Sequence, residues 1–213
     1  HGAIEPGSAT TGLPHASVLA LHEDASGTIW IGTFAGLARA RSGVIVDEVF
    51  PLRRSRAPVN GLATDHDGSL WIGTYGEGLV RWRDGRTERF AKGDGLADDF
   101  VRGLVVDADD SLWIATDRGG LGRLKDGVIT AVTTREGLPN DTVRAVVEDV
   151  NGTMWIGTHG GGLAALTGTG VSVMTTRDRL LSNVVFALGA GRRGALWIGT
   201  YNGGLNRLDA GRM

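Results

Sequence analysis

The 213-residue chain contains no cysteine, which excludes disulfides, thiolate metal ligands and cysteine nucleophiles. Only two lysines occur, and 22 basic against 24 acidic residues give a net charge of −2, without the basic excess typical of nucleic-acid binding. No apolar run approaches the ~18 residues of a membrane-spanning helix. Residues 1–10 also lack the basic and apolar regions of a signal peptide. We therefore expect no nucleic-acid partner and no membrane contact by this segment itself.

Proline is scarce too, with five residues, whereas glycine is abundant, with 35. Glycine interrupts apolar, β-branched segments along the whole chain, and no low-complexity tract or long helical periodicity occurs. Such a distribution favours many short strands joined by tight turns.

Five tryptophans recur at intervals of 41 or 42 residues, each inside a similar phrase. The phrases TIWIGT, SLWIGT, SLWIATD, TMWIGT and ALWIGT contain Trp30, Trp71, Trp113, Trp155 and Trp197. An aspartate stands six residues before the first four tryptophans, and Gly191 takes its place in the fifth unit. A glycine-leucine step follows every phrase. A regular period of this length predicts one structural unit for each repeat.

Each repeat is predicted to form four strands. In the fourth unit these are residues 141–149, 153–158, 163–166 and 171–176, with a hairpin turn at Asn151-Gly152. Four strands in about 42 residues are typical of a propeller blade. Because a lone blade would leave both faces in water, we expect the tryptophans to be buried between neighbouring blades.

The sequence therefore predicts an all-β fold, a β-propeller of five four-stranded blades in a single domain, 1–213. The expected blades are 12–50, 51–90, 95–134, 137–176 and 180–211, with an N-terminal strand in 2–10 completing the last blade. The alternative is that the five units close by assembling with other copies.

The repeat resembles that of the two-component regulator propeller family. The shared pattern is D-x-x-G-x-[LMI]-W-I-G-T-x-x-G-G-L, preceded by G-L-x-x-[DNS]-x-V at 95–101 and 137–143, and in part at 12–18 and 180–185. The resemblance implies a periplasmic or extracytoplasmic sensor region of a bacterial membrane receptor, several of which respond to oligosaccharides. The family's propellers typically have more blades than the five counted here.

The resemblance also implies that the first strand of each blade lies nearest the axis, so that two sets of loops share one face. The residue after the conserved threonine varies while the phrase around it is held, which indicates a position free for binding. The expected ligand-binding residues are Phe34, Tyr75, Glu77, Asp117, Arg118, His159, Tyr201 and Asn202. The other loop set holds His15, Asp98, Asp99, Asn140, Asp141, Ser182 and Asn183. Aromatic faces with carboxylate, guanidinium and amide groups suit a small polar ligand or an oligosaccharide. The alternative is that these are ordinary exposed turn residues.

Residues elsewhere in the repeat favour structural roles. The recurring aspartates (Asp24, Asp65, Asp107 and Asp149) match turn devices rather than a calcium loop, so no metal is expected. The recurring arginines (Arg39, Arg81, Arg123 and Arg207) are predicted to line blade edges rather than a phosphate patch.

No catalytic motif or cofactor signature occurs, and we expect a non-enzymatic sensing or interaction domain. Two alternatives remain open. One is a protein-interaction scaffold without a small ligand, including self-association through the blades. The other is a propeller enzyme of the streptogramin-lyase kind, for which His159 with Glu77 gives a loose parallel.

Overall fold

The computed structural model describes residues 12–42, 44–48, 56–191 and 194–209. These residues form nineteen β-strands and three short 3-10 turns, and none of them is α-helical. The strands make five antiparallel sheets, each following chain order. The predicted five-bladed all-β propeller is therefore confirmed.

Four blades are four-stranded within the described residues, and the fifth has three strands. Blade one contains β1 (Val18–Glu23), β2 (Ile29–Thr33), β3 (Gly36–Arg41) and β4 (Val44–Glu48). Blade two contains β5 (Val59–Thr64), β6 (Leu70–Thr74), β7 (Leu79–Arg83) and β8 (Arg86–Phe90). Blade three contains β9 (Val101–Val106), β10 (Leu112–Thr116), β11 (Leu121–Lys125) and β12 (Val128–Val132). Blade four contains β13 (Val143–Glu148), β14 (Met154–Thr158), β15 (Leu163–Thr167) and β16 (Gly170–Met174). Blade five contains β17 (Val185–Ala190), β18 (Leu196–Thr200) and β19 (Gly204–Leu208). The predicted strand completing blade five, in 2–10, lies outside the described residues.

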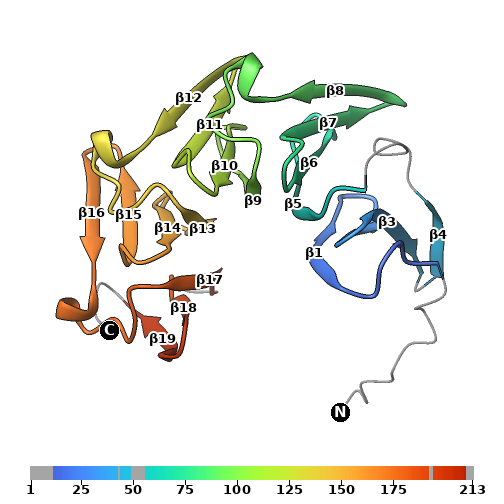
Figure 1. Ribbon diagram of the computed structural model, residues 1–213. Coiled ribbons are helices and arrows are strands. Elements are labelled where there is room, and N and C mark those ends of the chain that lie inside the picture. The colour runs from blue at the N-terminus through green and yellow to red at the C-terminus, as the bar shows by residue number, and fades with distance from the viewer. Residues whose placement is uncertain (1–11, 43, 49–55, 192–193, 210–213) are drawn as a thin grey trace, which may run out of the picture.

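The blades stand side by side around a common centre, with their first strands innermost and their fourth strands outermost (Figure 1). Contacts join β1 to β5, β5 to β9, β9 to β13 and β13 to β17. Three of the connections from an outer strand to the next inner strand contain a 3-10 turn, at Lys92–Asp94, Thr134–Glu136 and Thr176–Asp178. The first strands therefore line the hub, as the resemblance implied.

The apolar core lies between neighbouring sheets. Trp30 of blade one, 4% exposed, packs with Val59, Leu62 and Ile72 of blade two. Trp71, Trp113 and Trp155 have equivalent places in the next three interfaces. The predicted position of these four tryptophans between blades is confirmed.

Trp197 differs from the other four tryptophans, since it is 42% exposed. The expectation that all five are inter-blade core is wrong for this residue. The reason is that no blade follows β17–β19 in the described part of the chain, so no neighbouring sheet covers the Trp197 side chain. Blade one shows the complementary exposure, with Leu21 67% exposed where the equivalent Leu62 is only 7% exposed. Figure 1 accordingly shows an arc of blades that is open between blade five and blade one.

Candidate functional site

The variable residue after each conserved threonine is fixed at one level of the hub by its backbone. Its N–H donates to the carbonyl of the residue that precedes the first strand of the same blade, over 2.8 to 3.0 Å. The donor residues are Phe34, Tyr75, Asp117, His159 and Tyr201, and the acceptors are Ser17, Pro58, Phe100, Thr142 and Val184. These five predicted binding residues therefore share one end of the blades.

A second variable position at the hub comes from a bulge in every first strand. The pairing of each first strand with its neighbour shifts register by one residue directly after the initial valine. The extra residues are Leu19, Asn60, Arg102, Arg144 and Phe186. A bulge re-aims a side chain and frees it from the ladder. The sequence analysis missed these five residues. The available signal was a variable residue that always stands between a valine and an alanine or glycine.

Tyr75, Arg102 and Asp117 form a connected cluster across blades two and three. The Arg102 guanidinium donates from Nε to Asp117 Oδ1 over 2.6 Å, and its carbon lies 5.1 Å from the Tyr75 ring centroid. The Tyr75 hydroxyl lies 3.4 Å from Asp117 Oδ2. Phe100 packs against the same Tyr75 ring, with centroids 4.8 Å apart. The predicted residues Tyr75 and Asp117 are thus brought together.

Arg144 and two aromatic rings continue the hub into blades four and five. The Arg144 guanidinium carbon lies 5.0 Å from the Phe186 ring centroid, and Phe186 lies 5.6 Å from the Tyr201 ring. Burial lowers the pKa of Arg144, and the nearby Arg102 charge lowers it further, while Asp117 and Tyr75 oppose the shift. Phe186 and Tyr201 are 44% and 56% exposed, so aromatic surface is open to solvent at this end of the hub.

The remaining predicted binding residues do not join these clusters. The Glu77 carboxylate pairs with Arg89 of β8 at 3.3 Å, on the outer hairpin of blade two, whereas His159 belongs to blade four. The Arg118 side chain is exposed, and its backbone N–H donates to Asp98. Asn202 adopts a positive φ of 57° in the turn before β19. His159 is exposed beside Thr142.

The other loop set proves to be mainly structural. The side chains of Asp99, Asp141 and Asn183 accept the N–H of Lys92, Thr134 and Thr176, the first residues of the three 3-10 turns, over 2.7 to 2.8 Å. They therefore anchor each blade connection to the next inner strand. His15 alone of this set adds an aromatic contact, 5.5 Å from Phe34.

The recurring aspartates at the opposite end act as turn devices, and they also hold the tryptophans. Each accepts backbone N–H groups of its own turn, and its second oxygen accepts the indole N–H of the tryptophan six residues on. The indole contacts of Asp24, Asp65, Asp107 and Asp149 measure 2.8, 2.9, 2.7 and 2.8 Å. No three His, Asp or Glu side chains among the described residues are grouped to hold a metal ion.

Three of the four recurring arginines stack on the tryptophan directly across the strand pair. The guanidinium carbons of Arg81, Arg123 and Arg207 lie 5.2 to 5.4 Å from the indole centroids of Trp71, Trp113 and Trp197. This placement supports a packing role in the blade interface.

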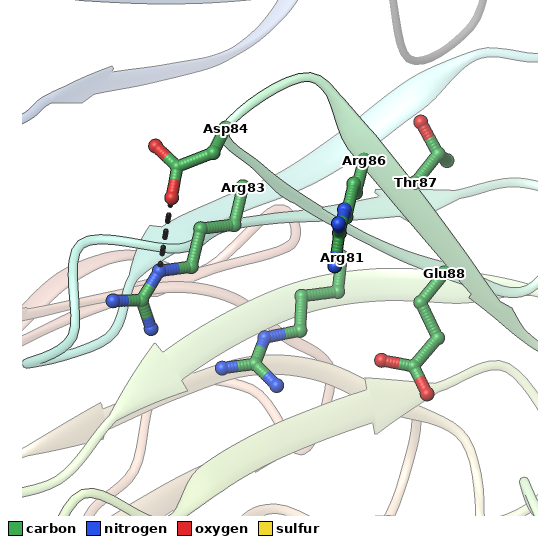
Figure 2. A pocket seen from close by; sticks show the side chains of 6 residues that line it. All are labelled: Arg81, Arg83, Asp84, Arg86, Thr87 and Glu88. Atoms are coloured by element: carbon green, nitrogen blue, oxygen red, sulfur yellow. Dashed lines mark ion pairs between the residues drawn. The ribbon is translucent and has the colours of Figure 1, made fainter.

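A pocket of about 780 Å³ lies on the outer hairpin of blade two, away from the hub. Figure 2 shows Arg81, Arg83 and Arg86 beside Asp84 and Glu88 in its wall. Arg83 pairs with Asp67 and Asp84, and Arg81 pairs with Asp65. Because most of this positive charge is already compensated, the pocket is a weaker candidate than the hub.

Comparisons with known proteins agree with the repeat and with the fold. The family described as "Two component regulator propeller" matches residues 12–35, 55–76, 95–118 and 137–160. The extracellular domain of a protein described as a hybrid two-component system of B. thetaiotaomicron has a TM-score of 0.76 at 25% identity, over 88% of this chain and 26% of that one. The extracellular domain of a one-component system from the same organism has a TM-score of 0.72 at 19% identity, over 91% and 29%. Virginiamycin B lyase of Staphylococcus aureus also shares the fold, with a TM-score of 0.72 at 18% identity, over 94% and 70%. No curated protein sequence matches the chain.

The fold and the repeat define a propeller domain of the two-component sensor type. Four of its five repeats match the two-component regulator propeller family. It spans about a quarter of the length of the receptor domains that it resembles. No helix in the described residues has the length and hydropathy of a membrane span.

Proposed function

We propose that this chain is a ligand-sensing propeller of a bacterial signal-transduction receptor, exposed outside the cytoplasm. It binds a small polar ligand, of which an oligosaccharide fits best, at the hub, and it catalyses no reaction itself. The observation that carries this proposal is the pair of variable positions in each blade, which gather exposed aromatic rings and polar groups at one end of the hub. Sugars are commonly bound by an aromatic face with hydrogen-bonding side chains around it.

Signalling follows if the ligand has different affinities for two arrangements of the blades. The hub residues belong to several blades. The Arg102–Asp117–Tyr75 cluster, for example, joins blades two and three. A ligand that contacts several blades therefore favours one relative arrangement over another.

The test is a thermal-shift screen against a broad panel of oligosaccharides. We expect at least one to raise the melting temperature, and Tyr75→Ala with Tyr201→Ala to remove the shift. Tyr75→Phe keeps the ring that contacts Phe100 and Arg102, and Arg86→Gln changes an exposed residue of the outer hairpin. Both should retain most of the effect. The absence of any shift across the panel would contradict the proposal.

A protein-interaction scaffold is the second candidate, and the exposed apolar face of blade five favours it. Trp197, Leu205 and Leu181 are all exposed there. A scaffold would bind a protein or another copy through this face without responding to sugars. A lyase-like activity would instead require turnover that His159→Ala removes.

A further inference from the structure

Arg144 is a hub residue whose guanidinium Nε has no hydrogen-bond partner among the described residues. It is the extra residue of the β13 bulge, between Arg102 of blade three and Phe186 of blade five. Its neighbours Val143 and Ala145 pair with Thr158 and Gly157 of β14, whereas Arg144 itself takes no part in the ladder.

Arg102 and Arg144 lie near one carboxylate, that of Asp117, and Arg102 is the arginine that pairs with it. Asp117 is engaged by Arg102 through a 2.6 Å hydrogen bond, in an ion pair that is largely buried. In the described part of the chain Arg144 has no ion-pair partner, and its Nε is buried without a hydrogen-bond partner. Its guanidinium group lies against the face of the Phe186 ring. The hub therefore carries an uncompensated positive charge beside exposed aromatic surface.

We propose that Arg144 binds an oxyanion, a carboxylate or a sulfate, of an acidic saccharide whose ring stacks on Phe186 and Tyr201. A planar guanidinium matches both oxyanions with two parallel hydrogen bonds. Partial burial strengthens such a contact relative to one on the open surface. The inference rests on the proposed function and narrows its ligand class from polar to anionic.

The direct test is isothermal titration with saccharides that differ in charge. Oligogalacturonides carry carboxylates, chondroitin sulfate disaccharides carry both groups, and cello-oligosaccharides of equal length are neutral. We expect an acidic saccharide to bind at least about ten-fold more tightly than the neutral one at low salt, with the preference falling as salt is added. Comparison of the two acidic ligands separates carboxylate from sulfate recognition.

Arg144→Gln should remove most of the preference for the acidic ligand and leave neutral binding within about two-fold, while Arg144→Lys keeps part of it. Arg86→Gln, a cation removed from the outer hairpin, is the matched control and should bind like the parent chain. Melting temperatures of the three variants show whether each is folded.

The outcomes separate this inference from the broader proposal. Neutral and acidic saccharides of equal affinity, or a preference unchanged in Arg144→Gln, would overturn the inference while leaving a sugar-binding hub intact. The absence of binding by every saccharide would overturn both.

Discussion

At the scale of single residues, an aspartate and a tryptophan six positions apart hold the tight turn in each of the first four repeats. Asp149 accepts the N–H groups of Asn151 and Thr153 with one oxygen and the Trp155 indole with the other. Burial of this carboxyl raises its pKa, but the hydrogen bonds from Trp155, Asn151 and Thr153 outweigh burial, and the pKa is lowered from the ordinary 3.8. The same balance lowers the pKa of Asp24. The ionised form is therefore part of the folded structure.

This balance predicts loss of stability in acid. Because the pKa of Asp149 is lower in the folded chain than in the unfolded chain, the stabilisation by its ionised carboxylate is complete above about pH 4. This stabilisation disappears as the pH falls through the pKa of the folded chain. Asp149→Asn should reduce the free energy of unfolding by about 1 kcal/mol at pH 7. The difference from the parent chain should shrink between pH 4 and 2 in urea titrations.

Asp126→Asn is the matched control, since Asp126 is an exposed turn residue of blade three. It should change stability little at either pH. A difference for Asp149→Asn that stays constant with pH would contradict the charged role of the carboxylate.

At the scale of the elements, the glycine after the tryptophan-isoleucine pair sets the distance between blades. A Cβ added at Gly157 of β14 would lie 2.6 Å from Val185 Cγ1 on the next blade. Gly32 and Gly73 face Val59 and Val101 in the same way. At Gly199 of β18 the nearest atom to such a Cβ is Ala187 of the same blade, at 3.4 Å. Blade three has Ala115 at this position, fully buried in the same apolar cluster as Val143 of blade four, so the interface admits only a very small side chain there.

Two identical substitutions separate these environments. Gly157→Val should force blades four and five apart and lower the free energy of unfolding by about 1–3 kcal/mol. At protein concentrations at which the chain is a monomer, Gly199→Val, on the open face, should cost less than about 1 kcal/mol. Chemical denaturation monitored by circular dichroism checks both. Equal losses would indicate that another sheet covers the Gly199 face in solution.

The blades could be predicted from the sequence because every repeat has the same spacing of strands and turns. The position of the four buried tryptophans between blades follows from that spacing. The sequence was insufficient for the short 3-10 turns, although Thr133-x-x-Glu136 and Thr175-x-x-Asp178 are capping boxes that could have been recognised. It also missed Arg102, Arg144 and Phe186, because the alternation of a strand does not indicate a bulge, and their variation after the valine was the remaining signal. Tyr75 and Asp117, predicted as binding residues from their variation, lie in contact with each other, whereas Glu77 pairs with Arg89 of the outer hairpin.

At the scale of the whole molecule, the arc ends in two apolar faces that match each other. Blade five presents Trp197, the counterpart of tryptophans that are covered elsewhere, and blade one presents Leu21, the counterpart of the leucines that cover them. Exposed patches of this kind commonly mark contact surfaces.

We therefore expect copies of the chain to associate through these faces. Sedimentation should show a mass that increases with protein concentration, and Trp197→Glu should return it to that of a single 22.3 kDa chain. Phe34→Glu, at the hub end of blade one, is the control and should leave association unchanged. A parent chain that stays monomeric at every concentration would refute this expectation.

The recurring bulge in the first strands has a consequence for how such a molecule diversifies. Every blade offers one side chain on its innermost strand that takes no part in the ladder, and the five hold equivalent register positions. Selection can therefore alter them one at a time, and a common scaffold can acquire new specificities without passing through unstable intermediates.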